Sequence, residues 1–368
     1  MRAGHRRRLV GARSRISVMG PQIEYAMTSD GVRIATLALG AGKPLLIAAT
    51  PPWSHVLLEF GIPPVTMWLE AIGRHARVVR YDCRGTGLSD RHLLDFSIEA
   101  QVRDMEAVAD HYGLGSFAIW GAIGGSPAAM AYAARHPDRV SHLFLWGAYA
   151  RGAELFRWNA SAWGALLRED WEMYTDAYAQ AAFGWPDSDT AARYADLTRA
   201  AITHEGMLAF VREMSAADVT SEARDIRTPT LVLTRRDAKH AGVAEARELA
   251  AMIPAARLLI LDGSSAAPFL DDAASVVSAI REFMASDEPP RRRKAAGVAL
   301  TERETQVLGL LAHGRTGKEM AAELGISIAT TQRHIANIYA KIGARGRVEA
   351  AAYAFERGIG GRDPGVPT

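Results

Sequence analysis

The chain has 368 residues, 49% of them hydrophobic, which is enough to bury one large core and a second, smaller one. Its formal charge of +2 hides a segregation: residues 1–20 carry six Arg and no acid, residues 21–289 carry 24 Lys and Arg against 34 Asp and Glu, and residues 290–368 carry 13 against 7. A single cysteine, Cys83, excludes an internal disulfide and fits a reducing cytoplasm, and no apolar run approaches the roughly 18 residues that cross a bilayer.

The N-terminal segment, residues 1–20, is rich in arginine but lacks the apolar stretch of a secretory signal. It is either a disordered basic arm or an over-extended start, and we favour Met19 as the true first residue. The basic residues 290–368 follow an acidic body, and a basic end of this kind suits a polyanion such as nucleic acid.

Residues 21–286 alternate strand and helix patterns, which favours a mostly parallel α/β sheet preceded by a hairpin that turns at Asp30-Gly31. The expected strands are residues 44–49, 77–82, 116–120, 140–147, 228–234 and 256–261. The expected helices are residues 63–74, 97–112, 125–135, 243–252 and 268–284.

The alternation is interrupted from about residue 149 to residue 219, where no strand pattern occurs but large apolar side chains such as Trp163 and Tyr178 are frequent. Most of the aromatic side chains of this insertion are expected to form its own core, and the remainder to face a cavity.

The segment Gly121-Ala122-Ile123-Gly124-Gly125 lies between an expected strand and an expected helix and has the spacing of G-x-S-x-G. That turn presents a serine nucleophile, and its glycines prevent collisions. Here the nucleophile position is Ile123, which has no nucleophilic atom, and a β-branched residue tolerates a strained turn poorly.

The block Arg80 to Asp90, together with residues 131–140 after the turn, resembles the α/β-hydrolase family, in a bacterial branch where this fold precedes a LuxR-type DNA-binding domain. The resemblance covers residues 22–284 and implies a Ser-His-Asp triad at Ile123, Ala266 and Ala238. All three positions are therefore replaced, and the triad acts only as a unit. Side chains that an active hydrolase would have to recruit instead are Ser126, Asp237, His55, His204 and His240.

The second oxyanion donor of this family follows the strand 44–49, where the chain reads Thr50-Pro51-Pro52, and a proline has no N–H to donate. The resemblance also implies that the insertion caps the active site. We expect a dry cavity that binds a small apolar molecule without turnover. The expected lining residues are Pro51, Trp53, His55, Ala122, Ile123 and Gly124.

Two capping boxes, at residues 301–304 and 316–319, begin two short helices near the C-terminus. The turn 325–327 precedes a third helix that we expect to end at about Ile342, and Ser327 is placed to cap it. Two short helices joined by a glycine-containing turn form a helix-turn-helix. The core-facing side of the third helix carries Thr331, Ile335, Ile338 and Ile342.

The opposite side of this helix carries polar groups that suit a DNA major groove, since Gln pairs with adenine, Arg with guanine and Lys with phosphate. The run from Leu300 to Ala350 resembles the LuxR-type helix-turn-helix, although Gly317, Thr331 and Gln332 depart from its usual residues. By that resemblance, the residues that contact the DNA backbone are Lys318, Thr330, Asn337 and Lys341. Those that face base edges are Gln332, Arg333 and Ala336.

The expected architecture has four parts. Residues 21–286 form an α/β-hydrolase fold whose helical cap spans about residues 149–219, and residues 287–296 form a linker. Residues 297–360 form a small all-α helix-turn-helix domain, and residues 361–368 form a tail. We expect a cytoplasmic transcriptional regulator that senses a small ligand and binds double-stranded DNA as a homodimer, with RNA polymerase as a candidate partner. No metal, cofactor or membrane is expected. The alternatives are an active hydrolase that uses displaced residues, and a ligand-independent regulator whose body is a scaffold.

Overall fold

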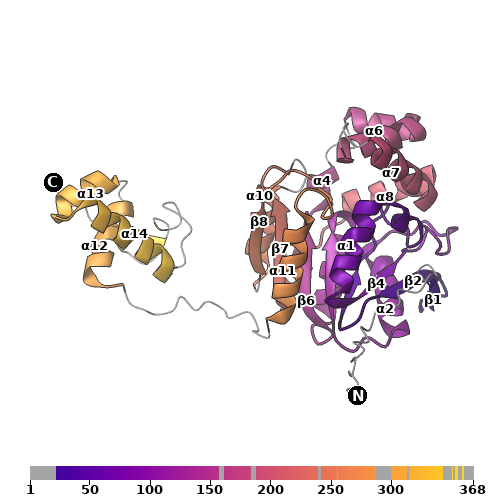
Figure 1. Ribbon diagram of the computed structural model, residues 1–368, viewed down its shortest axis with the longest axis horizontal. Helices are drawn as coiled ribbons and strands as arrows, with labels where there is room; N and C mark the ends of the chain where they lie inside the picture. The colour runs from indigo at the N-terminus through magenta and orange to yellow at the C-terminus, as the bar shows by residue number, and fades with distance from the viewer. Residues whose placement is uncertain are drawn as a thin grey trace, which may run out of the picture. The chain divides into compact units, whose positions relative to one another are not determined.

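The computed structural model describes residues 22–156, 161–183, 188–238, 242–254, 256–286, 300–312, 315–342, 350, 353–354 and 359. It divides the chain into two compact units, residues 1–290 and residues 291–368 (Figure 1). The basic segment 1–20, the linker 287–296 and the tail 361–368 lie outside the described residues.

The first unit is built on an eight-stranded sheet with the order β1-β2-β4-β3-β5-β6-β7-β8. The strands are β1 Glu24–Met27, β2 Arg33–Leu39, β3 Lys43–Ile47, β4 Ala76–Tyr81, β5 Phe117–Ala122, β6 Val140–Trp146, β7 Thr230–Arg235 and β8 Ala256–Leu261. The hairpin turns at Gly31, whose φ of 82° favours glycine, and from β4 onward the pairing is parallel, as expected.

Helices cover both faces of the sheet and bury one apolar cluster on each. One face packs against α1 Pro63–Gly73 and α11 Ala273–Ala285, which lie together at the front of Figure 1. The other packs against α2 Ile98–His111, α3 Ser126–Arg135, α9 Thr220–Asp225 and α10 Val243–Met252. The expected start of the last helix at residue 268 is wrong, because Asp272 caps α11 by accepting a hydrogen bond from the Ser275 N–H.

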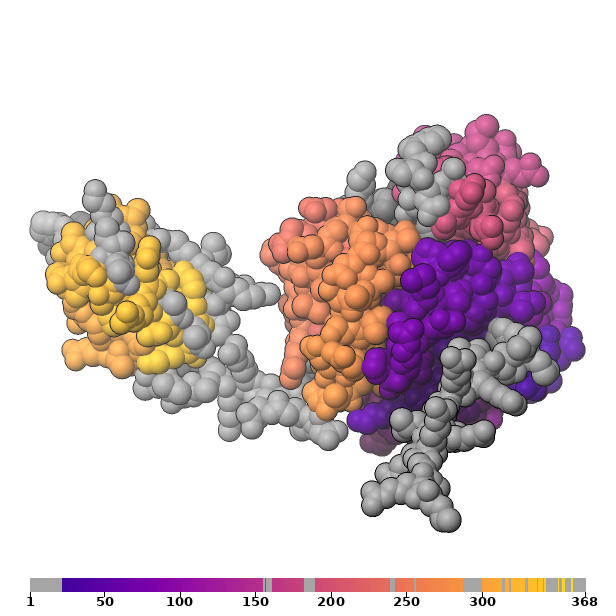
Figure 2. All heavy atoms as spheres, in the orientation of Figure 1, coloured from indigo at the N-terminus to yellow at the C-terminus, as the bar shows by residue number. Residues whose placement is uncertain are grey.

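The insertion contains helices and, within its described residues, no strand. Its helices are α4 Gly152–Leu155, α5 Ala162–Glu169, α6 Trp171–Phe183, α7 Ser188–Ala201 and α8 His204–Ala216. A single β-bridge between Arg151 and Asp218 joins its two ends. We call this segment the cap, and Figure 2 shows it, pink to rose, as a raised lobe of the first unit.

The second unit contains α12 Glu302–Ala312, α13 Gly317–Leu324 and α14 Ile328–Ile342. Both capping boxes are present, and Gly325 ends α13 in the left-handed conformation with a φ of 62°. The Ser327 hydroxyl accepts from the Thr330 N–H at 3.1 Å and caps α14. The buried core of this unit includes Val307, Leu308, Leu311, Met320 and Ile338.

Across the described part of the chain, no helix combines the length and the apolar character that a bilayer span requires.

Candidate functional site

The turn between β5 and α3 keeps the geometry of a nucleophile elbow. Ile123 has a φ of 43°, a strained conformation that costs a non-glycine residue about 1 to 3 kcal/mol. A Cβ added at Gly121 would lie 2.6 Å from the Ala129 Cβ, and one added at Gly125 would lie 2.5 Å from the Ala49 carbonyl oxygen. The β-branched residue therefore adopts the strained turn after all, because close packing around the glycines holds the backbone there.

Ser126, the nearest alternative nucleophile, is buried at the first position of α3. Its hydroxyl donates a hydrogen bond to the Ile123 carbonyl oxygen at 2.7 Å. The side chain is therefore turned back toward the N-terminal side of α3 and bonds the elbow turn, as the helical direction of side chains predicts.

The three positions that the resemblance assigns to the triad line one cavity. Ala238 follows β7, Ala266 lies in the loop after β8, and both line the same cavity as Ile123. Asp237 is not one of the lining residues, and its N–H donates to the Gly263 carbonyl oxygen at 3.0 Å. Among the histidines that an active hydrolase would have to recruit, His204 stacks on Trp171 in the cap, and His240 lies outside the described residues.

The loop that carries Ala266 is fixed by side chains that sequence reasoning missed. The Trp146 indole N–H donates to the Ala266 carbonyl oxygen at 2.6 Å. The Arg235 guanidinium, which is buried, donates to the carbonyl oxygens of Asp262 and Leu270 and lies 5.3 Å from the centre of the Trp146 ring. The sequence signal that could have identified Arg235 was an arginine at the end of a strand expected to be buried.

Asp271 holds the same loop from its other end. Its carboxylate accepts the N–H groups of Ser264 and Ser265, each at 2.9 Å. Burial raises the pKa of Asp271, but these two hydrogen bonds outweigh it and hold the pKa below its usual range. Hydrogen bonds thus hold the loop that carries Ala266, the position that the resemblance assigns to the histidine.

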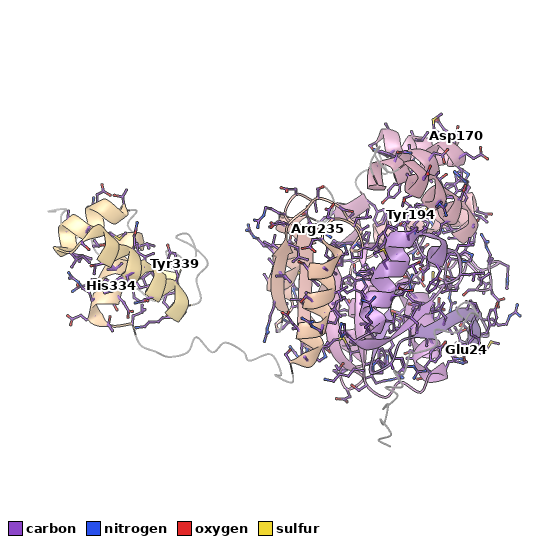
Figure 3. All side chains as sticks on the ribbon, viewed as in Figure 1. Glu24, Asp170, Tyr194, Arg235, His334 and Tyr339 are labelled. Carbon is purple, nitrogen blue, oxygen red and sulfur yellow. The ribbon has the colours of Figure 1, made fainter. Side chains whose placement is uncertain are left out.

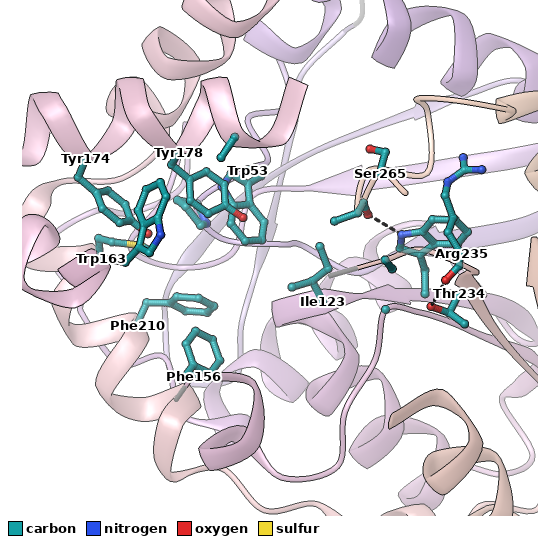
Figure 4. A pocket seen from close by; sticks show the side chains of 17 residues that line it. Trp53, Ile123, Phe156, Trp163, Tyr174, Tyr178, Phe210, Thr234, Arg235 and Ser265 are labelled. Carbon is teal, nitrogen blue, oxygen red and sulfur yellow. Dashed lines mark hydrogen bonds between the residues drawn. The ribbon is translucent and has the colours of Figure 1, made fainter. Parts of the chain in front are cut away.

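The cavity between the cap and the sheet has a volume of about 140 Å³. Figure 4 shows the cap aromatics on one side of Ile123 and Thr234 and Ser265 on the other. The lining residues are Pro52, Trp53, Ile123, Trp146, Gly147, Phe156, Trp163, Tyr174, Tyr178, Ala181, Met207, Phe210, Thr234, Arg235, Ala238, Ser265 and Ala266. We call this cavity the chamber.

Two of the six expected lining residues, Trp53 and Ile123, line the chamber, and Pro52 takes the place of Pro51. The others do not line it. Ala122 packs into the apolar cluster that includes residues of α1 and α11. Gly124 lies against the Phe210 ring, since a Cβ added at Gly124 would lie 2.7 Å from the Phe210 Cζ.

His55 is buried beside the chamber rather than in its wall. Its Nδ1 accepts the N–H groups of Leu57 and Leu58, both at 3.3 Å. Burial lowers the pKa of His55, against the opposing field of Glu59, and a ring nitrogen that accepts hydrogen bonds must be unprotonated. The imidazole therefore fixes a loop in its neutral form.

The loop after β3 offers little to an oxyanion. Pro51 and Pro52 have no N–H, and the Trp53 N–H donates to the Thr50 carbonyl oxygen at 2.7 Å. Asp82, from the block after β4, secures the neighbouring segment by accepting the N–H groups of Val56 and Leu88, both at 2.9 Å. The Trp53 N–H and the Asp82 carboxylate therefore serve the fold.

In the second unit, α14 exposes Gln332, Arg333 and Asn337, whereas Thr331 and Ile338 are buried on its other side. Figure 3 labels His334 and Tyr339 on the same helix, and both are half-buried. Thr330 is half-buried, with its hydroxyl 2.8 Å from that of Ser327. The side chains of Lys318, in α13, and Ala336, in α14, lie outside the described residues.

Lys341, an expected DNA-backbone contact, forms an ion pair within the second unit. Its ammonium lies 2.6 Å from the carboxylate of Glu304, the acid of the first capping box, whose side chain is 5% exposed. Lys341 is the main cause of a lowered pKa at Glu304. The ion pair ties the end of α14 to the start of α12, and the ammonium has two further N–H donors.

No group of three or more His, Cys, Asp or Glu side chains is placed to hold a metal ion in the part of the chain that the structure describes.

Known proteins match the two units separately. Residues 59–273 match the α/β hydrolase fold family, and residues 298–354 match the bacterial regulatory proteins of the luxR family. The putative carbamate hydrolase RutD of Caulobacter sp. (strain K31) is 28% identical over 204 residues, 52% of this chain and 76% of RutD. The transcriptional regulatory protein LiaR of Bacillus subtilis is 46% identical over 56 residues, 15% of this chain and 26% of LiaR.

Solved structures share the fold of the first unit. The enol-lactonase from Burkholderia xenovorans LB400 has a TM-score of 0.60 and 22% identity, and the match covers 72% of this chain and 100% of the enzyme. An esterase from Exiguobacterium antarcticum has a TM-score of 0.62 and 19% identity over 73% of this chain. The chain therefore belongs to the α/β-hydrolase fold family and carries a LuxR-type DNA-binding domain C-terminal to that fold.

Proposed function

We propose that the protein is a cytoplasmic, DNA-binding transcriptional regulator whose α/β-hydrolase-fold unit binds a small apolar molecule without converting it. One observation carries this proposal: Ile123, Ala238 and Ala266, at the positions of nucleophile, acid and base, line one chamber. None of these side chains can attack a carbonyl, accept a proton or orient a base.

The surroundings of the chamber support binding over turnover. The Ser126 hydroxyl donates to the Ile123 carbonyl oxygen, and the loop after β3 contains Pro51 and Pro52, so neither a nucleophile nor a full oxyanion hole is at hand. The wall is mostly aromatic and aliphatic, and binding sites for small molecules are commonly apolar concavities of this kind.

The second unit supplies the output. Gln332 and Arg333 are exposed on α14 and have the side chains that read adenine and guanine in a major groove. We propose that the regulator binds as a homodimer and that RNA polymerase is a candidate partner. The ligand would then act by stabilising one arrangement of the two units over another.

The test couples the two sites. A ligand at 100 times its Kd should stabilise the first unit by about 2.7 kcal/mol, and an allosteric ligand should change DNA affinity by about 1 to 3 kcal/mol. DNA duplexes selected from a random pool, and small molecules screened by thermal stabilisation, supply the reagents. Fluorescence anisotropy then measures DNA affinity with and without ligand.

Ile123→Trp is the informative variant, because it fills the chamber from the elbow. It should abolish ligand binding and the DNA response but leave DNA affinity without ligand intact. Met67→Trp is the matched control, since Met67 is 68% exposed and does not line the chamber. If Ile123→Trp folds and still responds, the ligand site lies elsewhere. A ligand that binds without changing DNA affinity would favour a scaffold role for the first unit.

A hydrolase assay addresses the competing activity. Simple p-nitrophenyl esters should be hydrolysed no faster than in buffer. Turnover that disappears in Ser126→Ala would overturn the non-catalytic assignment, because it would show that the displaced serine attacks substrate.

A further inference from the structure

We propose that the ligand of the chamber is a neutral, planar molecule of about one aromatic ring, which enters past Trp163 between α5 and α6. This inference rests on the proposed function and adds the size, shape, charge and route of the ligand.

The volume of the chamber sets the size. At about 140 Å³ it is close to the roughly 150 Å³ of apolar protein cavities that bind benzene. A long acyl chain or a two-ring system exceeds this volume unless the cap opens. The space therefore fits one ring with a small substituent.

The aromatic wall sets the shape. Trp53 and Tyr178 stack at 5.1 Å with an interplanar angle of 13°, and the Trp163 ring stands edge-on to Tyr178 at 79°. Phe156 and Phe210 meet at 78° on the same side of Ile123 (Figure 4). Rings in these orientations offer both faces and edges, which a flat aromatic guest contacts better than a puckered saturated one.

The charge distribution favours a neutral ligand. Arg235 is the one charged residue among those that line the chamber, and its guanidinium points away from Ile123 (Figure 4). It is held by the carbonyl oxygens of Asp262 and Leu270, and its Nε lies 3.7 Å from the Asp271 carboxylate. Asp271 already compensates the charge of Arg235, so a carboxylate in this chamber would lose its hydration without gaining an unpaired cation, and an ammonium would find no acidic side chain among the lining residues.

One wall residue can recognise a polar substituent. The Ser265 oxygen accepts the Ala267 N–H at 3.1 Å, so its hydroxyl hydrogen can be donated to an oxygen of the ligand. Ser265 lies across the chamber from the cap aromatics (Figure 4). A ring with one small oxygen-bearing group satisfies both ends.

A second hollow on the cap marks the route. It shares Trp163 and Ala181 with the chamber and is lined elsewhere by α6 and by Asp170, which Figure 3 labels at the outer side of the cap. Trp163 is 38% exposed, although it also lines the chamber. Glu172 and Asp176 add carboxylates to the hollow, and Asp176 pairs with Arg199. An anion approaching by this route meets like charge.

The experiment uses the full chain and four probes of matched size: benzyl alcohol, cyclohexylmethanol, benzoate and benzylamine. Benzyl alcohol should raise the melting temperature and bind about tenfold more tightly than cyclohexylmethanol, as one additional ring contact implies. Benzoate and benzylamine should cause no shift at the same concentration near pH 7. Equal affinity for the saturated ring, stronger binding of either ion, or no response to any probe would overturn the inference.

Two variants locate the site and the route. Ala238→Phe should remove benzyl alcohol binding by filling the chamber. Ala181→Trp should slow association at least about tenfold by narrowing the shared wall, whereas Ala177→Trp, in the outer hollow alone, should not. Unchanged association in Ala181→Trp would overturn the route. The probe series on the unmodified chain decides the ligand class even if a variant misfolds.

This design separates the two levels of inference. If a larger or charged molecule both stabilises the first unit and changes DNA affinity, the ligand class is wrong and the proposed function stands. If benzyl alcohol binds in the chamber and no ligand alters DNA affinity, the ligand class stands and the sensor function fails.

Discussion

The elbow in the first unit and helix α14 in the second differ in what accompanies their backbone geometry. The elbow has the backbone of a nucleophile turn without a reactive side chain, whereas α14 has both the helix and polar side chains that can contact DNA. At the elbow the backbone is retained, with Gly121 and Gly125 in close packing, while Ile123 has no chemistry to present. On α14, the helix and its outward-facing Gln332 and Arg333 are both present. Packing constrains the two glycines independently of the residue between them.

The two units can also be compared by the roles of one basic residue in each. Arg235 lines the chamber and Lys341 lies on the recognition helix, so both stand where a ligand is expected. Yet Arg235 holds two carbonyl oxygens of a loop, and Lys341 holds Glu304. A positive charge beside a site is therefore not by itself a contact to the ligand.

The strongest test of the retained elbow is Gly125→Val. The new side chain would collide with the Ala49 carbonyl oxygen, and we expect the first unit to lose about 3 kcal/mol. All eight tryptophans lie in the first unit, so denaturation followed by tryptophan fluorescence reports on that unit alone. Gly115→Val is the control, since nothing lies within 4 Å of its Cβ. An unchanged midpoint for Gly125→Val would mean that the elbow is not constrained.

On the other side of the comparison, Arg333→Ala should weaken operator binding by about 1 to 3 kcal/mol and relax the preference at one base position. The reason is that an exposed guanidinium on α14 can bond a guanine edge in two places. Affinities for an operator and its single-base variants measure the effect. Equal losses on operator and random duplexes would show that this face does not read bases.

Lys341→Met separates an internal ion pair from a phosphate contact. We expect the second unit to lose about 1 to 2 kcal/mol of stability because the Glu304 carboxylate loses its partner. The lowered pKa of Glu304 stabilises the fold above the unfolded value of about 4.5, and this contribution is lost as pH falls through the folded pKa. The loss of stability of the second unit as pH falls should therefore be smaller in the variant than in the unmodified chain.

The salt dependence of DNA binding tests whether Lys341 contacts a phosphate. If the ammonium stays paired with Glu304, the slope of log affinity against log salt should be the same in Lys341→Met and in the unmodified chain. A slope lower by about one unit would place Lys341 on a phosphate.

The smallest expected effect concerns His55. Its folded pKa lies below the usual 6.5, so the neutral imidazole stabilises the first unit above that pH, and the contribution is lost as pH falls below 6.5. His55→Asn keeps an acceptor for the backbone N–H groups and removes the titration. It should flatten stability between pH 7 and pH 5, measured by denaturation at each pH. A profile identical to that of the unmodified chain would exclude His55 as the source.

Local sequence determined the elements with few errors. The capping boxes at residues 301–304 and 316–319 act over three residues, and strand and helix periodicity placed most boundaries close to those observed. The start of α11 was missed although its cap is local, since the Asp272 carboxylate accepts the Ser275 N–H three residues on. The residues before it form a loop in which Asp271 accepts the Ser264 N–H. The assignment of Ile123, Ala238 and Ala266 followed from motif positions along the chain, and the chamber brings all three together.

Only the tertiary structure decided what surrounds those positions. Trp146 bonds Ala266 from a distant strand, cap residues such as Phe210 close the chamber, and Lys341 meets Glu304 across the second unit. Sequence spacing determines which residues lie on one face of a helix or strand, because that periodicity is set by the local backbone. Which faces then meet depends on how helices and strands far apart in the chain pack, so the chamber wall and the ion pairs had to be seen in three dimensions.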